Sequence, residues 1–197
     1  MKHLRVFVLA FWILAMVLVV PHTATAYTQV TATYYSLPHS EPRDITSGPD
    51  GNLWFTEEYA NKIGKITPAG VITEYAVPTA DSRPTGITSG PDGNLWFTEY
   101  SGNKIGKITT VGVITEYAVP TSNSSPTGIT SGPDGNLWFT ESSGNKIGKI
   151  TTAGVIVEYA LPNSGSQPKG ITSGPDGNLW FTESSGNKIG KITTASS

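Results

Sequence analysis

The chain has 197 residues and a formal net charge of −2, and it contains 22 glycines and 14 prolines while only 14% of its residues are charged. This length is ample for a buried core, and many turn formers beside few charges favour short strands over amphipathic helices and argue against disorder. Lysine and arginine form no cluster in the body of the chain, which argues against nucleic acid as a partner. The absence of cysteine excludes disulfides, thiolate metal sites and thiol catalysis.

The N-terminus has the pattern of a secretory signal peptide. Lys2 and Arg5 precede an apolar run from Val6 to Val20, and Ala24-Thr25-Ala26 forms a small-x-small cleavage site. The run is shorter than a membrane span, so an uncleaved anchor is the weaker interpretation. We expect a signal peptide over residues 1–26, a mature chain of 27–197 outside the membrane, and a secreted or periplasmic location.

The rest of the chain is an internal repeat. The string Ile-Thr-Ser-Gly-Pro-Asp-Gly-Asn-Leu-Trp-Phe-Thr-Glu occurs four times, 42 residues apart, and residues 87–128 share 34 of 42 positions with residues 129–170. Periods of this length with several strands per unit are typical of propeller blades. The sequence predicts an all-β protein, a β-propeller of four-stranded antiparallel blades over residues 27–197.

Each unit contains four segments with strand character. In the second unit these are residues 86–89, 95–99, 104–109 and 113–119, separated by turns rich in glycine, asparagine and aspartate. The run Leu95-Trp96-Phe97 is apolar on both sides, as expected for a strand buried between neighbouring blades. The tryptophan of each unit is therefore interpreted as a residue that packs between blades, and the aspartate of Gly-Pro-Asp-Gly as a turn residue.

The two ends of the mature chain suggest how the ring closes. Residues 30–38 align with the fourth-strand pattern of residues 112–120, whereas the C-terminus stops just after a third strand. We expect the N-terminal segment to supply the fourth strand of the last blade, since this would leave no exposed sheet edge. A dimer formed by exchange of this strand is the alternative to a monomeric four-bladed ring.

The repeat Pro-Thr-Gly-Ile-Thr-Ser-Gly-Pro-Asp-Gly-Asn-Leu-Trp-Phe-Thr-Glu, followed by Asn-Lys-Ile-Gly-Lys-Ile-Thr, resembles the repeat of the streptogramin (virginiamycin B) lyase family. The resemblance covers essentially the whole mature chain. It implies a propeller fold, which in that family has seven blades, and in some members a Mg²⁺-dependent elimination that opens cyclic depsipeptide antibiotics. A chain with four units is also what a contracted copy of a seven-bladed ancestor would look like.

The departures from the family concern its catalytic residues. The resemblance places catalytic histidines directly after the proline that begins each unit, and here those positions hold Arg43, Thr85, Thr127 and Lys169. The family's essential glutamate, fourteen residues later, is matched by Glu57, Glu99, Glu141 and Glu183. If the chain is a lyase, the candidates for catalysis are His39, Lys169 and Glu183, because His39 is the one histidine left after signal removal.

The four glutamates also raise the question of a metal. A fourfold arrangement would bring Glu57, Glu99, Glu141 and Glu183 to one face, where Mg²⁺ would relieve their repulsion. The alternative is that each carboxylate serves its own loop. Two functions follow: an exported, non-catalytic binding or scaffold propeller for a small-molecule, peptide or surface ligand, and a Mg²⁺-dependent lyase acting on streptogramin B-type esters.

Overall fold

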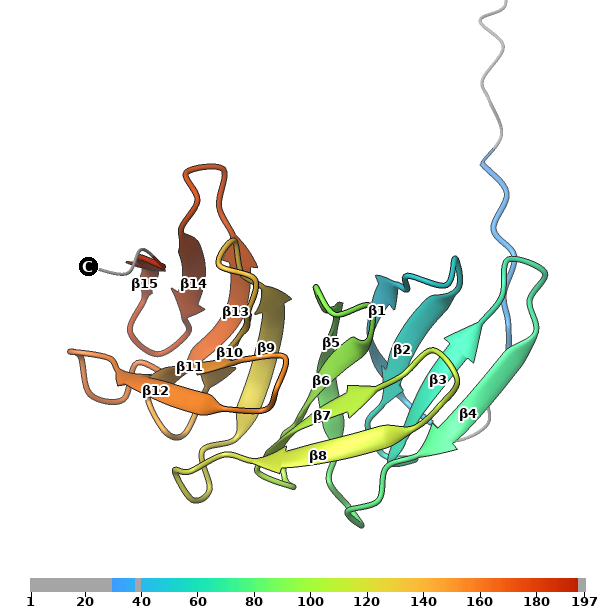
Figure 1. The fold of residues 1–197 in the computed structure, drawn as a ribbon, viewed down its shortest axis with the longest axis horizontal. Coiled ribbons are helices and arrows are strands. Elements are labelled where there is room, and N and C mark those ends of the chain that lie inside the picture. The colour runs from blue at the N-terminus through green and yellow to red at the C-terminus, as the bar shows by residue number, and fades with distance from the viewer. Residues whose placement is uncertain (1–29, 38–39, 195–197) are drawn as a thin grey trace, which may run out of the picture. The chain divides into compact units, whose positions relative to one another are not determined.

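Fifteen β-strands and no helix are found in the computed structural model of this chain over its described residues, 30–37 and 40–194 (Figure 1). None of these residues belongs to a helix that could cross a membrane. The strands pair in sequence order into antiparallel sheets, β1 to β4, β5 to β8, β9 to β12 and β13 to β15. Their bounds are β1 Pro42–Ser47, β2 Leu53–Glu57, β3 Lys62–Ile66, β4 Ile72–Ala76, β5 Pro84–Ser89, β6 Leu95–Glu99, β7 Lys104–Ile108, β8 Ile114–Ala118, β9 Pro126–Ser131, β10 Leu137–Glu141, β11 Lys146–Ile150, β12 Ile156–Ala160, β13 Pro168–Ser173, β14 Leu179–Glu183 and β15 Lys188–Ile192.

The turns inside each sheet are set by a few repeated side chains. Asp92 accepts a hydrogen bond from the Trp96 indole (3.0 Å) and bonds Asn94, while Gly93 adopts φ 73°. Asn103 lies in the left-handed region, and its side chain donates to the Val119 carbonyl across the sheet. These contacts confirm that the aspartate of Gly-Pro-Asp-Gly is a turn residue, because its carboxylate holds the hairpin and the indole together.

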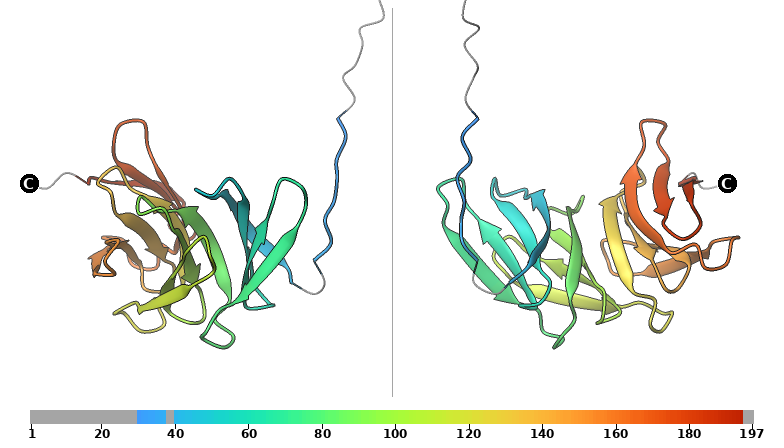
Figure 2. Two further views of the ribbon diagram at one scale, coloured as in Figure 1. Left: turned by 45° about the vertical axis from the view of Figure 1, so that its right-hand side comes forward. Right: turned by 180° about the vertical axis from the view of Figure 1, so that it is seen from behind.

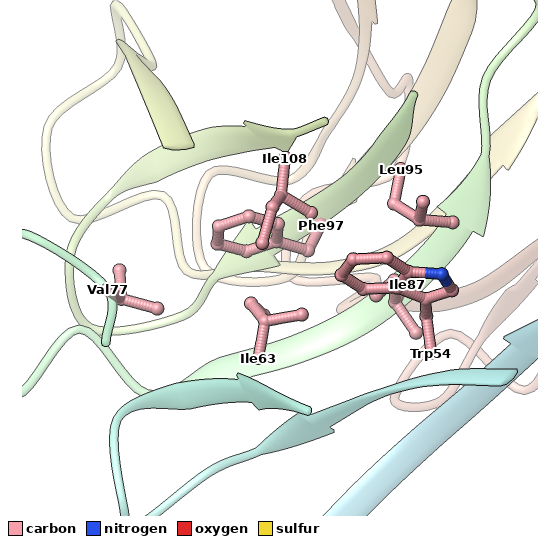
Figure 3. Packing of buried hydrophobic residues seen from close by; sticks show 7 residues of the cluster. All are labelled: Trp54, Ile63, Val77, Ile87, Leu95, Phe97 and Ile108. Carbon is pink, nitrogen blue, oxygen red and sulfur yellow. The ribbon is translucent and has the colours of Figure 1, made fainter. Parts of the chain in front are cut away.

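Consecutive sheets stack face to face in chain order, as Figure 2 shows from two sides. Between the first two sheets, Trp54 and Ile63 of the first pack against Leu95 and Phe97 of the second, and all four are 0% exposed (Figure 3). The same cluster forms between the second and third sheets and between the third and fourth. The tryptophans of these interfaces are therefore packing residues, as predicted.

The innermost strands are also joined by hydrogen bonds from sheet to sheet. The Thr98 hydroxyl receives the Gly86 amide of its own sheet (2.9 Å) and donates to the Thr127 carbonyl of the next (2.7 Å). At the C-terminal ends of the inner strands, serine hydroxyls also form hydrogen bonds between sheets. Ser89 donates to the Ser47 carbonyl, and Ser131 donates to the Ser89 carbonyl. Each blade is thus tied to its neighbour by both apolar packing and hydrogen bonds.

The all-β propeller architecture is confirmed, but the expected closure of the ring is not observed. The sheet β13–β15 has three strands, and the described residues 30–37 form no strand. The inner strands pack on one another in the order β1, β5, β9, β13, and β1 does not pack on β13 in this way. The predicted signal peptide, residues 1–26, lies outside the described residues. Residues 40–194 thus form four consecutive propeller blades, of which the last has three described strands.

Candidate functional site

A hollow of about 350 Å³ lies where the loops leading into the inner strands meet. Its walls come from all four sheets, because the same repeat positions face it each time. One set of lining residues follows the proline that begins each inner strand: Arg43, Thr85, Thr127 and Lys169. These are the positions at which the family resemblance places histidines, so the hollow is where that family's chemistry would be expected.

The backbone around the hollow is irregular in a repeated way. The pairing of β5 with β6 shifts register between Pro84 and Ile87, and the other inner strands do the same. Such bulges reorient side chains at functional sites. The residue just before each proline has a positive φ, for example 54° at Arg83 and 50° at Gln167. Non-glycine residues pay a conformational cost there, and such strain often accompanies a site.

An arginine–glutamate–tyrosine cluster dominates one side of the hollow. Glu58 is buried (5% exposed) and pairs with Arg43 (Nη1–Oε2 3.4 Å) and with Arg83. The Arg83 guanidinium also lies over the rings of Tyr59 and Tyr100, 5.1 Å and 5.6 Å from their centroids. Glu58 therefore orients two arginines, while the tyrosine rings flank the second of them.

These residues were missed by reasoning on the sequence, although a signal was present. The residues that line the hollow fall at four positions of the repeat, and the side chain at each position varies between units: Glu41, Arg83 and Gln167; Arg43, Thr85, Thr127 and Lys169; Glu58, Tyr100 and Ser142; Tyr59 and Ser143. Packing positions stay constant because every interface between blades is the same. The connectors and outer strands vary as well, for example Asn123 against Gly165 and Thr115 against Val157, but at the hollow the varied side chains of all four blades meet on one surface.

The four glutamates of the Leu-Trp-Phe-Thr-Glu strands lie elsewhere, each buried inside its own blade. Glu57, Glu99 and Glu141 are 0% exposed, and neither oxygen of these carboxylates has a hydrogen-bond partner within the described residues. Burial raises the pKa of Glu99 to about 8, with repulsion from Glu116 adding to it. Burial and a neighbouring glutamate likewise raise the pKa of Glu57 and of Glu141 to about 7.

The predicted metal ring is not assembled. Over residues 30–37 and 40–194, no group of three or more histidine, cysteine, aspartate or glutamate side chains is placed to hold a metal ion. Glu57, Glu99, Glu141 and Glu183 end separate strands, and none of them lines the hollow. The side chain at the end of this strand turns into its own blade, where Glu99 meets Gly102.

The candidates for lyase catalysis are also separated. Lys169 is exposed and lines the hollow, and its carbonyl accepts a hydrogen bond from Thr140 (2.7 Å). Glu183 is 5% exposed, and among the ion pairs of the described residues none joins it to Lys169. His39 lies outside the described residues. Of the two candidates among the described residues, Lys169 lines the hollow and Glu183 does not.

The chain matches a known protein family over most of its length. The model of the virginiamycin B lyase family matches residues 18–197. Virginiamycin B lyase from Staphylococcus aureus is 52% identical with a TM-score of 0.79, covering 82% of this chain and 55% of that one. A catalytically inactive histidine-to-alanine variant of the Staphylococcus aureus enzyme, solved with quinupristin, is 51% identical with a TM-score of 0.81, covering 84% and 57%.

More distant structures share the fold alone. The WD40 β-propeller domain of Doa1 is 12% identical with a TM-score of 0.65, covering 78% of this chain and 51% of that one. A search of curated protein sequences gives no match. The chain spans little more than half the length of the lyases it matches.

Proposed function

Because the chain belongs to the virginiamycin B lyase family, we propose that it is an exported, non-catalytic binding module whose ligand occupies the hollow at the mouth of the inner strands. The observation that carries this proposal is the contrast between constant packing residues and a varied hollow. No lining position keeps one residue through all four units, whereas the residues between blades are repeated almost unchanged. Selection for packing explains why the residues between blades are constant, and a ligand explains why the residues of the hollow vary.

The chemistry of the lining indicates the class of ligand. Arg43, Arg83 and Lys169 set three cationic side chains against the carboxylates of Glu41 and Glu58. Arginine offers paired donors for carboxylates and carbonyl groups, and the exposed tyrosine rings beside it offer apolar faces. A small molecule or peptide with several carbonyl oxygens and an aromatic or apolar part matches this lining.

The residues in place support binding without catalysis. Elimination needs a base within hydrogen-bond reach of the proton it removes. None of Arg43, Thr85 and Thr127 can serve, and no ion pair or side-chain hydrogen bond of the described residues positions the exposed Lys169 side chain for proton removal. The described glutamates with raised pKa values do not face the hollow.

The test uses quinupristin, the compound present with the inactive relative. Calorimetric titration of the full chain should give saturable binding, and chromatography after long incubation with Mg²⁺ should show no linear product. Arg83→Ala should weaken binding by about tenfold or more, because a charge-assisted hydrogen-bond donor is lost. Lys62→Ala is the matched control, since it removes a cation in the first blade outside the hollow.

The second candidate is a Mg²⁺-dependent lyase that opens streptogramin B-type esters by elimination. It is favoured by the 51–52% identity to the lyases. Mg²⁺-dependent conversion of quinupristin that is lost in Glu183→Gln and in Lys169→Ala or His39→Ala would establish it and overturn the binding module. Neither binding nor conversion would contradict both functions.

A further inference from the structure

The first and last blades each leave one face uncovered. Leu53 of β2 is 43% exposed, whereas its repeat equivalent Leu95 is 0% exposed. At the other end, Ile189 of β15 is 66% exposed and Trp180 of β14 is 36% exposed, although the equivalent Ile147 is 0% exposed. A large apolar face between polar rims is characteristic of an interaction surface.

The two uncovered faces are the two halves of an interface that the chain already makes three times. In each internal interface, the tryptophan and the β-strand isoleucine of one blade pack on the leucine and phenylalanine of the next, as Trp96 and Ile105 do on Leu137 and Phe139. The last blade presents the first half through Trp180 and Ile189, and the first blade presents the second half mainly through Leu53, since Phe55 is 5% exposed. Because the sequence is repeated, these two faces are complementary in the same way as the two faces of each internal interface.

Tyr35 shows that the first blade already holds part of a preceding one. Its ring lies against Gly70 so closely that a Cβ on this glycine would overlap it. In the same way, the ring of Tyr75 lies against Gly112. Tyr75 belongs to the outer strand of the preceding blade, and the alignment of residues 30–38 with 112–120 gives Tyr35 that same place in the repeat.

The tyrosine and the tryptophan at the two ends are unmatched halves of one stack. Tyr75 stacks on Trp54 of its own blade, with ring centroids 5.7 Å apart, and the next two blades repeat this pair. Within the described residues, neither Tyr35 nor Trp180 has such a partner. They do not meet within one chain, because β1 and β13 are not packed together as successive inner strands are.

We propose that a second copy of the chain completes the last blade: β15 of each copy pairs with residues 32–36 of the other, and Trp180 stacks on the tyrosine at position 35 of that copy. The register follows that of β7 with β8, where Ile105 lies opposite Tyr117, so Ile189 lies opposite the same tyrosine. Two reciprocal contacts close a twofold ring of eight blades, a number within the range of known propellers. This proposal is independent of the ligand in the hollow.

Disulfide trapping tests the pairing, because the chain has no cysteine of its own. Tyr35→Cys combined with Ile189→Cys in the full chain should form a covalent dimer under mild oxidation, since opposed residues of antiparallel strands lie within bridging distance. The control pair Tyr117→Cys and Ile105→Cys has the same register inside one blade and should bridge within a single chain. Light scattering of the unmodified chain should give twice the chain mass.

Three results would overturn the proposal. A bridge within one chain between the thiols introduced at positions 35 and 189 would mean that the chain's own N-terminal segment closes a smaller ring. Two free thiols in a monomer would mean that the faces stay uncovered. A ladder beyond two chains would exclude the closed ring.

A second variant avoids any effect of the introduced thiols. Ile189→Glu should raise the dimer dissociation constant by about 10- to 100-fold, because it places a charge in an apolar contact. The circular dichroism spectrum should be unchanged, since Ile189 is exposed in the single chain. An unchanged dissociation constant in this variant would contradict the pairing of β15 with the second copy.

Discussion

The inner and the terminal blades carry nearly the same sequence but have different surroundings. The sheets β5–β8 and β9–β12 are covered on both faces, whereas β1–β4 and β13–β15 are each covered on one. Leu95 and Leu53 therefore differ in exposure, 0% against 43%, while standing in identical sequence strings. The comparison teaches that the contribution of a repeat residue to stability depends on whether a neighbouring blade covers it. Four kinds of variant test this difference.

The largest difference is expected at the tryptophans, measured by urea unfolding in the Ile189→Glu background, which weakens the proposed contact with a second copy. Trp96 is 0% exposed, stacks on Tyr117 and donates to Asp92, so Trp96→Ala should cost about 3–5 kcal/mol. Trp180→Ala should cost about 1–2 kcal/mol, because this side chain is 36% exposed and leaves a smaller cavity. Equal losses at the two positions would contradict the difference between blades.

The next difference is expected at the glycines of the third strand in each blade. A Cβ on Gly106 would overlap the Phe97 ring, which is wedged between two sheets and cannot move. Gly64 has the same relation to Phe55, which is 5% exposed but is not a member of the apolar clusters found between blades among the described residues. Thermal unfolding should show Gly106→Ala destabilising by about 2–3 kcal/mol and Gly64→Ala by about 1–2 kcal/mol, because the Phe55 ring is not held by the side chains of a preceding blade.

The pH dependence of stability should reflect the buried glutamates. An unfolded glutamate ionises near pH 4.5 and Glu99 in the folded chain only near pH 8, so between these values the folded state keeps a proton that the unfolded state has released. Stability therefore falls as pH rises across this window. Glu99→Gln should reduce the fall and stabilise the chain by about 2 kcal/mol at pH 8, with little effect at pH 4, while Glu57 and Glu141 still contribute their share.

Two other glutamates sharpen this measurement. For Glu57 the window ends near pH 7, so Glu57→Gln should give a smaller gain that is complete by that pH. Burial by itself raises the pKa of Glu116, but its bonds to Lys104 and Thr79 outweigh burial, so the pKa of Glu116 is lowered. Glu116→Gln should accordingly destabilise the chain above pH 5. The urea midpoints of the three variants, measured from pH 4 to pH 9, show whether each substitution stabilises or destabilises the chain.

The smallest difference is expected at the surface ion pairs of the outer strands. Lys104 bonds Glu116, and both also hold Thr79 of the preceding connector. Lys62 pairs with Glu74 alone, at greater exposure. Lys104→Ala should cost about 1 kcal/mol and Lys62→Ala clearly less, since an isolated exposed pair contributes little. Urea unfolding in low and high salt measures both, and a larger loss at Lys62 would contradict the role of the connector.

The sequence by itself determined the repeated elements of this protein. Apolar triplets such as Leu95-Trp96-Phe97, flanked by Asp-Gly and Asn turns, are local signals, and the predicted strands of the second unit differ from β5 to β8 by at most two residues at an end. Four copies of one string also fixed the stacking, because each face is fitted to its neighbour. The family follows from the same strings, since they extend over the whole repeat.

Only the tertiary structure decided where the varied residues meet and which faces stay open. Glu58 and Arg83 are 25 residues apart and carry no local motif, and a bulge and a left-handed residue bring them to one hollow. Sequence symmetry suggested that four glutamates converge, but the pleat of each strand turns them into their own blades. The open ends depend on the angle between stacked sheets, a quantity set by side-chain packing across the interface and not by the order of residues along one strand.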